Sequence, residues 1–180
     1  MPKKRVSQTN IQVKHSMYES LLKLLERKTF SSISVSDVTS EAGVSRMSFY
    51  RNYESIEDIL VEHLNEVVEE YKKEKIEKAI PENENIYYGK CYMIHCFQFF
   101  YKHHEFINTL ISCGMGDLFL AKITDCLIEK WVDKEKGTRD EVLKVCAYAG
   151  SIYNMYREWN KGDFQELPED IAEILYDVRR

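Results

Sequence analysis

Apolar residues recur along this chain every three to four positions, which is the spacing of a buried helix face. The pattern predicts a helix over residues 9–28, a connector over 29–33, and two short helices over 34–42 and 45–53. Further helices are expected over 55–79, 84–103, 104–113, 117–135, 138–161 and 168–178. No stretch alternates in the manner typical of a β-strand. The predicted fold class is all-α, with about nine helices in total.

Residues that favour helix caps and turns mark the ends of these helices. Ser34 and Ser45 are suitable N-caps, and Gly43 between them can adopt the positive φ that ends a helix. Ser55 followed by Asp58 resembles a capping box in which Asp replaces Glu. Residues 34–53 therefore predict two short helices joined by a tight turn, as in a helix-turn-helix motif.

The outer face of the second short helix carries no acidic residue. Arg can bridge guanine edges or phosphates, Ser, Tyr and Asn can bond phosphate oxygens, and Met can contact a thymine methyl group. Backbone amides at helix N-termini also favour phosphate. The candidate DNA-binding residues are Ser34, Ser45, Arg46, Met47, Ser48, Tyr50, Arg51 and Asn52. A capped pair of surface helices without a ligand is the alternative.

The distribution of charge changes what the total charge suggests. The chain has a net charge of −5, which by itself argues against nucleic acid as a partner. Residues 1–53 hold nine Lys and Arg against four Asp and Glu, a net charge of +5, so the remainder carries −10. A basic end on an acidic body is typical of a DNA-contacting surface, and an uneven scatter of charges is the alternative.

The run SVSDVTSEAGVS from Ser34 to Ser45, followed by FYRNY at 49–53 and SIEDIL at 55–60, resembles the DNA-binding domain of the TetR/AcrR family of repressors. The resemblance covers about residues 11–62. It implies a homodimer whose recognition helices enter successive major grooves of a palindromic operator, and which a small-molecule effector releases. It also implies residues 1–53 as a DNA-binding helix-turn-helix domain and residues 54–180 as a helical effector-binding and dimerisation domain.

The same resemblance implies roles for single residues. Arg46 and Met47 would read bases, whereas Ser48, Tyr50 and Asn52 would hold phosphate or adjacent base edges, with Phe49 and Tyr53 mostly in the core. Two positions depart from the family pattern, because Ile56 stands where Lys is frequent and Thr39 where Ala is common. The expected phosphate contact at position 56 is therefore in doubt, although the basic arm Lys3-Lys4-Arg5 or Arg51 could compensate.

The remainder of the chain is rich in aromatic, Met and Cys residues, and the resemblance suggests a ligand cavity there. The expected pocket residues are Tyr92, Cys96, Phe100, Phe106, Leu110, Met115, Phe119 and Tyr153. A dry core is the alternative for the same side chains. The resemblance also implies that the last two helices of each subunit form an intermolecular four-helix bundle. The expected interface residues are Val142, Ala149, Tyr156, Trp159, Ile171, Ile174 and Leu175, with intramolecular packing as the alternative.

The five cysteines are scattered without a CxxC motif, so no disulfide framework is expected. Cys91 and His95 lie four apart on one helix face and could bind a metal or act together in nucleophilic catalysis. No further ligand at diagnostic spacing, oxyanion-hole glycine or orienting acid accompanies them, so we expect no metal, no cofactor and no enzymatic activity. A thiol redox sensor would need a basic neighbour, for which Lys90 and Lys122 are the weak candidates.

No run of 18 apolar residues occurs, and no apolar stretch follows the basic N-terminus, so the expected location is cytoplasmic, without membrane contact. The expected partners are a palindromic double-stranded DNA operator, a second copy of the chain and an unidentified small-molecule effector. Ile56 and the acidic body keep a second hypothesis open. In it, the helix-turn-helix has weak affinity for DNA and the protein acts through protein partners.

Overall fold

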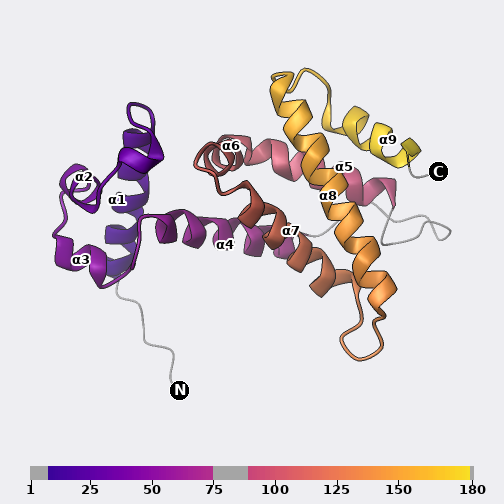
Figure 1. The fold of residues 1–180 in the computed structure, drawn as a ribbon, viewed down its shortest axis with the longest axis horizontal. Coiled ribbons are helices and arrows are strands. Elements are labelled where there is room, and N and C mark those ends of the chain that lie inside the picture. Colours follow the sequence, from indigo (N-terminus) through magenta and orange to yellow (C-terminus); the bar gives the residue numbers. More distant parts are fainter. Residues whose placement is uncertain (1–7, 75–88, 179–180) are drawn as a thin grey trace. The chain divides into compact units, whose positions relative to one another are not determined.

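The computed structural model describes residues 8–74 and 89–178, and all regular structure in these ranges is helical. The nine α-helices of the described residues confirm the predicted all-α fold class (Figure 1). Contacts divide the chain into two compact units, Met1–Glu66 and Val67–Arg180. The division falls within α4, Glu57–Lys73, whereas the sequence pattern places the domain boundary after residue 53. The difference arises because the first half of α4 packs against the first helix of the chain.

The N-terminal unit contains α1, Gln8–Leu25, α2, Val35–Glu41, α3, Arg46–Tyr50, and the first half of α4. The connector forms a short 3-10 turn at Phe30–Ser32. The first helix ends before residue 28 because the amides of Arg27 and Lys28 both donate to the Leu24 carbonyl, in a turn. Apolar side chains from all four helices and the connector form the core, which includes Met17, Leu21, Leu24, Ile33, Val38, Phe49, Ile59, Leu60 and Leu64.

The turn between α2 and α3 depends on Gly43, whose φ is +64°. The Gly43 amide donates to the Ser40 carbonyl at 3.3 Å, and the Val44 amide donates to the Thr39 carbonyl at 3.0 Å. These two bonds form a Schellman motif, which needs a left-handed residue at this position. Gly43 therefore ends α2 as the sequence predicts and sets the direction in which α3 begins.

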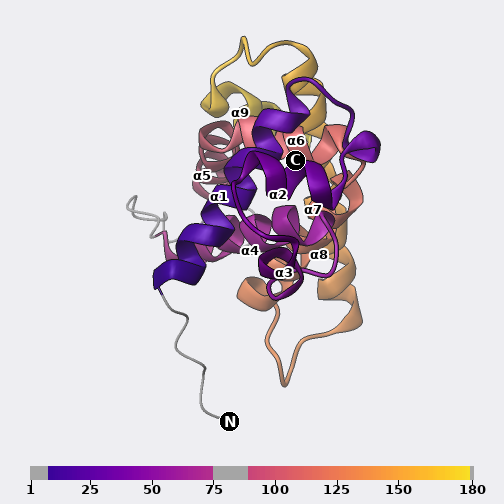
Figure 2. The ribbon, with the colours of Figure 1, turned by 90° about the vertical axis from the view of Figure 1, so that its left-hand side faces the viewer.

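The C-terminal unit contains the second half of α4 and five further helices. These are α5, Lys90–Lys102, α6, His104–Ser112, α7, Gly116–Trp131, α8, Arg139–Lys161, and α9, Pro168–Val178. Within this unit α9 packs on α5, and α7 packs on both α6 and α8, as Figures 1 and 2 show. Residues 75–88, which hold the predicted helix positions 75–79 and 84–88, lie outside the described residues.

Two helix ends in this unit show how local hydrogen bonds compete with helix continuation. The predicted helix over 117–135 stops at Trp131, because the Asp133 carboxylate accepts the amides of Glu135 at 2.8 Å and Lys136 at 2.9 Å. Thr138 and Glu141 then form a capping box at the start of α8. No helix in the described ranges is both long and apolar enough to cross a membrane.

Candidate nucleic-acid interface

The outward face of α3 presents the basic and polar side chains that the sequence pattern selects. Phe49 is fully buried and fixes the helix to the core, whereas Met47 is 73% exposed and Tyr50 is 55% exposed. Arg46 and Arg51 are also exposed, at the first turn and at the C-cap of α3. Neither Arg forms an ion pair with any of the described residues. Two guanidinium groups, a thioether and a phenol therefore project from one short helix into solvent.

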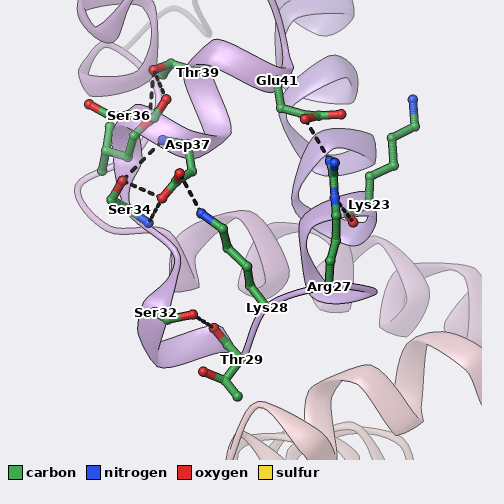
Figure 3. Close-up of polar contacts among 11 residues, drawn as sticks. Lys23, Arg27, Lys28, Thr29, Ser32, Ser34, Ser36, Asp37, Thr39 and Glu41 are labelled. Carbon is green, nitrogen blue, oxygen red and sulfur yellow. Dashed lines mark hydrogen bonds and ion pairs between the residues drawn. The ribbon is translucent and has the colours of Figure 1, made fainter.

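The polar groups of Ser34 form hydrogen bonds within the first turn of α2. Its hydroxyl accepts the Asp37 amide at 3.2 Å and donates to the Asp37 carboxylate at 2.7 Å, and its amide donates to the same carboxylate at 2.8 Å. These contacts form a complete capping box at the start of α2 (Figure 3). The ammonium of Lys28 and then Ser34 hold the pKa of Asp37 well below its usual range. Because an ionised carboxylate occupies this helix end, Ser34 has less capacity for a phosphate than the sequence suggests.

Ser45, Ser48 and Asn52 also bond within the motif. The Ser45 hydroxyl accepts the Ser48 amide at 3.1 Å, and the two hydroxyl oxygens lie 3.0 Å apart. The Asn52 side-chain amide donates to the Ser48 carbonyl at 2.8 Å, so it braces the end of α3. These three polar residues shape the helix, while the fully projecting groups are Arg46, Met47, Tyr50 and Arg51.

Ion pairs occupy several basic residues of the N-terminal unit, which the sequence pattern did not reveal. Arg27 donates to Glu41 at 2.8 Å, and Lys28 donates to Asp37 at 2.8 Å, so two cations at the end of α1 hold α2 (Figure 3). Lys14 on α1 pairs with Glu62 on α4. The opposite charges at these positions were visible in the sequence, but their pairing depends on how α1 meets α2 and α4.

The division of the chain inside α4 also changes the charge asymmetry. Residues 1–66 hold nine basic and nine acidic residues, a net charge of zero. Among the described cations of this unit, Arg46 and Arg51 at α3 and Lys23 on α1 form no ion pair. The arm Lys3-Lys4-Arg5 lies outside the described residues.

The two departures from the family pattern are explained by burial. The Thr39 hydroxyl donates to the Val35 carbonyl at 2.8 Å, which satisfies its polar group within the core. Ile56 is partly buried just before α4, and its carbonyl accepts the Ile59 amide at 3.1 Å. The Asp58 carboxylate accepts the amides of Glu54 and Ser55, which is half of the predicted capping box.

Three of the predicted pocket residues, Cys96, Phe100 and Phe119, line one apolar cavity of about 30 Å³ in the C-terminal unit. Its other walls come from α4, α5, α6 and α7, namely Val67, Val68, Tyr71, Phe99, Ile107, Ile123, Cys126 and Leu127. Tyr92, Phe106, Leu110, Met115 and Tyr153 do not line it. The sequence predicts which faces of these helices are apolar, but it does not predict where the packed helices leave a cavity.

The predicted interface residues fall into two groups. Val142 is partly exposed and Ile174 is exposed, so both have surface for a partner. The others are buried within a single protomer, namely Ala149, Tyr156, Trp159, Ile171 and Leu175. The Tyr156 hydroxyl, for example, donates to the Asn108 side-chain oxygen of α6 at 2.9 Å. The apolar residues that α8 and α9 expose also include Leu143 and Val178.

Burial disfavours the thiolate form of two cysteines. All five cysteines are free, and burial raises the pKa of Cys96 to about 12 and that of Cys126 above its usual value. The His95 ring stacks on Tyr71 with centroids 5.3 Å apart, and its Nε2 lies 3.6 Å from the carboxylate of Glu74, which directly follows α4. No hydrogen bond joins His95 to Cys91 among the described residues, and no group of three metal-ligating side chains gathers there.

Two family models match the chain. The model described as bacterial regulatory proteins of the tetR family matches residues 19–62, which contain α2 and α3. The model described as a transcriptional regulator C-terminal region matches residues 90–180, which is half of the chain. No curated protein matches the chain.

Solved structures share the fold over nearly the whole length. Lin0861 from Listeria innocua superposes with a TM-score of 0.78 at 18% identity, covering 100% of this chain and 95% of that one. A TetR transcriptional regulator from Streptococcus agalactiae 2603V gives 0.67 at 20% identity, covering 95% of each chain. The dihydroxyacetone kinase operon activator DhaS gives 0.55 at 20% identity, covering 93% and 94%. With a helix-turn-helix in the matched N-terminal segment and a matching regulatory C-terminal region, this chain belongs to the TetR family of transcriptional regulators.

Proposed function

We propose that the protein is a homodimeric regulator that reads a palindromic DNA operator with α3 and responds to a small-molecule effector. The observation that carries the proposal is the solvent-facing side of α3, where Arg46, Met47, Tyr50 and Arg51 project and neither Arg forms an ion pair with a described residue. A helix with this composition fits the major groove, in which Arg recognises guanine and Met contacts thymine.

The roles within α3 follow from where each side chain starts. Arg46 and Met47 lie in the first turn, which approaches the base edges most closely when a recognition helix enters the groove by its N-terminal end. Tyr50 and Arg51 lie at the far end and fit the phosphate backbone. Ser34, Ser45, Ser48 and Asn52 support this arrangement mainly through their internal hydrogen bonds.

Operator selection from random DNA, followed by footprinting, tests the reading of bases. Arg46→Ala is expected to weaken binding to the selected site by about 1–3 kcal/mol and to relax preference at one position of each half-site. Arg51→Ala is expected to weaken binding to all sequences and to reduce the slope of log affinity against log salt by about one. Lys161→Ala, which removes an exposed cation at the end of α8, is the control. Unchanged affinity and preference in Arg46→Ala would exclude the assigned role.

We assign the effector site and the dimer interface to the C-terminal unit. The apolar cavity between α4, α5, α6 and α7 is the proposed effector site, and its small volume requires these helices to move apart for any ligand larger than water. The exposed apolar residues Leu143, Ile174 and Val178 are the proposed contacts to a second copy. Because one protein of similar fold is an operon activator, the sign of regulation is best measured with a reporter gene in both directions.

A second function is favoured by the ion pairs of the N-terminal unit. Lys14, Arg27 and Lys28 are each neutralised by an acidic side chain, so half of the six described cations of this unit have less to offer a phosphate. Weak DNA affinity with action through protein partners would follow. A salt slope near zero on the selected operator would favour this function, whereas a slope of several units would favour direct DNA binding.

A further inference from the structure

A second pocket lies in the N-terminal unit. It has a volume of about 550 Å³ and opens between α1 and the first half of α4. Pockets of roughly 300–1,000 Å³ accommodate small organic molecules. Neither the DNA-reading face of α3 nor the apolar cavity of the C-terminal unit includes any of its lining residues.

Two helix faces form the walls of this pocket. The residues of α1 that line it occupy positions 11, 14, 15, 18 and 19, and those of α4 occupy positions 59, 62, 63 and 66. Both series follow the three-to-four spacing of a single helix face. The pocket therefore lies between one face of α1 and one face of α4, and Ile11 in its lining remains 57% exposed although it is apolar.

Aromatic and aliphatic groups make up the floor. The rings of Tyr18 and His63 meet with centroids 4.2 Å apart, and Ile59 is buried behind them. At the other wall Lys14 lies over the Tyr53 ring, with its Nζ 5.4 Å from the ring centroid. An apolar ligand could pack against both aromatic rings and branched aliphatic side chains. The cation–π contact of Lys14 with Tyr53 shows that a ring of this pocket already binds a cation.

The charges around the pocket are predominantly negative. Lys14 neutralises Glu62, which also accepts the Tyr53 hydroxyl. Glu19 and Glu66 remain, and neither forms an ion pair with Lys or Arg among the described residues. The Glu66 carboxylate lies 3.1 Å from His63 Nδ1, and the two form an ion pair only when the imidazole is protonated.

The field of these two carboxylates reaches into the pocket. Burial raises the pKa of the Tyr18 hydroxyl to about 12, with further increases from Glu19 and then Glu66. Tyr18, Glu19 and Glu66 all line the pocket. A positive group placed beside it would be attracted by both, whereas an anion would be repelled.

From these contacts we propose that the pocket between α1 and α4 binds an organic ammonium ion with an apolar body. The ammonium lies beside the carboxylates of Glu19 and Glu66, and the apolar body packs on Tyr18 and Ile11. The ligand bridges α1 and α4, so it stabilises the N-terminal unit without touching α3. This site is independent of the proposed effector cavity and of the proposed reading of DNA.

Three probes of the same size and different charge test the proposal, namely 2-phenylethylammonium, 2-phenylethanol and phenylacetate. Binding to the full chain in the absence of DNA is followed by amide chemical shifts in NMR spectra. The ammonium is expected to bind with shifts confined to α1 and the first half of α4. The alcohol is expected to bind about tenfold more weakly and phenylacetate more weakly still, because each partly exposed ion pair changes affinity about two- to fivefold.

Variants separate this site from general attraction to an acidic protein. Glu19→Gln combined with Glu66→Gln is expected to reduce affinity for the ammonium about tenfold and to equalise it with the alcohol. Glu26→Gln combined with Glu54→Gln removes the same charge from exposed positions of the unit outside the pocket and is expected to leave the affinity unchanged. Arg46→Ala is also expected to bind the ammonium normally, which keeps this test apart from the test of DNA binding.

Three outcomes would overturn the proposal. The first is equal affinity for the ammonium and the alcohol in the unmodified chain. The second is equal loss of affinity in the two double variants, which would indicate attraction by net charge alone. The third is a set of shifted amides outside α1 and α4, which would place the ligand elsewhere. The unchanged NMR spectrum of each double variant serves as the control for folding.

Discussion

Replacement of Gly43 by Ala isolates the backbone strain of the helix-turn-helix turn from any steric effect. A Cβ atom at Gly43 would meet no atom within 4 Å, so the cost comes from its φ of +64° alone. A left-handed conformation costs a residue other than Gly roughly 1–2 kcal/mol. Ala also restricts the unfolded chain, which returns about 0.4–1 kcal/mol. The free energy of unfolding should therefore fall by about 0.5–1 kcal/mol.

Gly150 supplies a matched control, since a Cβ atom there would also meet open space, but this residue lies inside α8 without a positive φ. Gly150→Ala should stabilise the C-terminal unit of a separate protomer by about 0.5–1 kcal/mol, because Ala favours the helix. If α8 lies against a partner subunit, the same methyl group should weaken association at low protein concentration. Sedimentation over a concentration series separates these two effects.

Thermal unfolding followed by circular dichroism measures both variants. For a unit of this size a change of 1 kcal/mol moves the midpoint by about 4–8 °C. Gly43→Asn should lose less than Gly43→Ala, because Asn tolerates the left-handed region better. An increase in the midpoint on Gly43→Ala would refute the reasoning, since it would mean that the turn does not require positive φ in solution.

Three further predictions concern the C-terminal unit. Burial lowers the pKa of His95 below 6.5, so the folded state binds a proton at this residue less readily than the unfolded state. The free energy of unfolding should therefore decline as the pH falls below 6.5. His95→Gln should flatten this decline in urea titrations at pH 7.5 and 5.5. Asp163 has a φ of +53°, so Asp163→Gly should raise stability by about 0.5 kcal/mol, and a lower thermal midpoint would contradict this. Tyr156→Phe removes the hydrogen bond to Asn108 and should cost about 1 kcal/mol, whereas Tyr101→Phe on α5, where the side chain is 45% exposed, serves as a comparison by urea denaturation.

The sequence was sufficient for features that depend on neighbours along the chain. The helix pattern, the cap at Ser34 and the positive φ of Gly43 all follow from short-range chemistry, and the structure confirms them. The same holds for the exposed face of α3, because the burial of Phe49 fixes where Arg46 and Met47 point. The helix ends at Leu25 and Trp131 are harder to predict from the sequence. Turn hydrogen bonds form there in place of one more helical residue, and the two alternatives differ little in free energy.

Features that depend on distant segments were decided by tertiary packing. The sequence alone suggests Trp159 and Tyr156 as interface anchors, but within the protomer Tyr156 bonds to α6 and both rings pack against Phe164. The pairing of Lys28 with Asp37 likewise depends on how α1 approaches α2. A periodic pattern identifies which face of a helix is buried, but not which helix covers it.

The sequence by itself therefore determined the all-α class, the helix-turn-helix and the residues that α3 exposes. Only the tertiary structure decided that the compact units divide inside α4, which cations remain unpaired and where the helices diverge to leave a pocket. The physical reason is range. Helix propensity, capping and turn strain act over a few residues, whereas pockets, ion pairs between helices and interfaces depend on the angles at which whole helices pack.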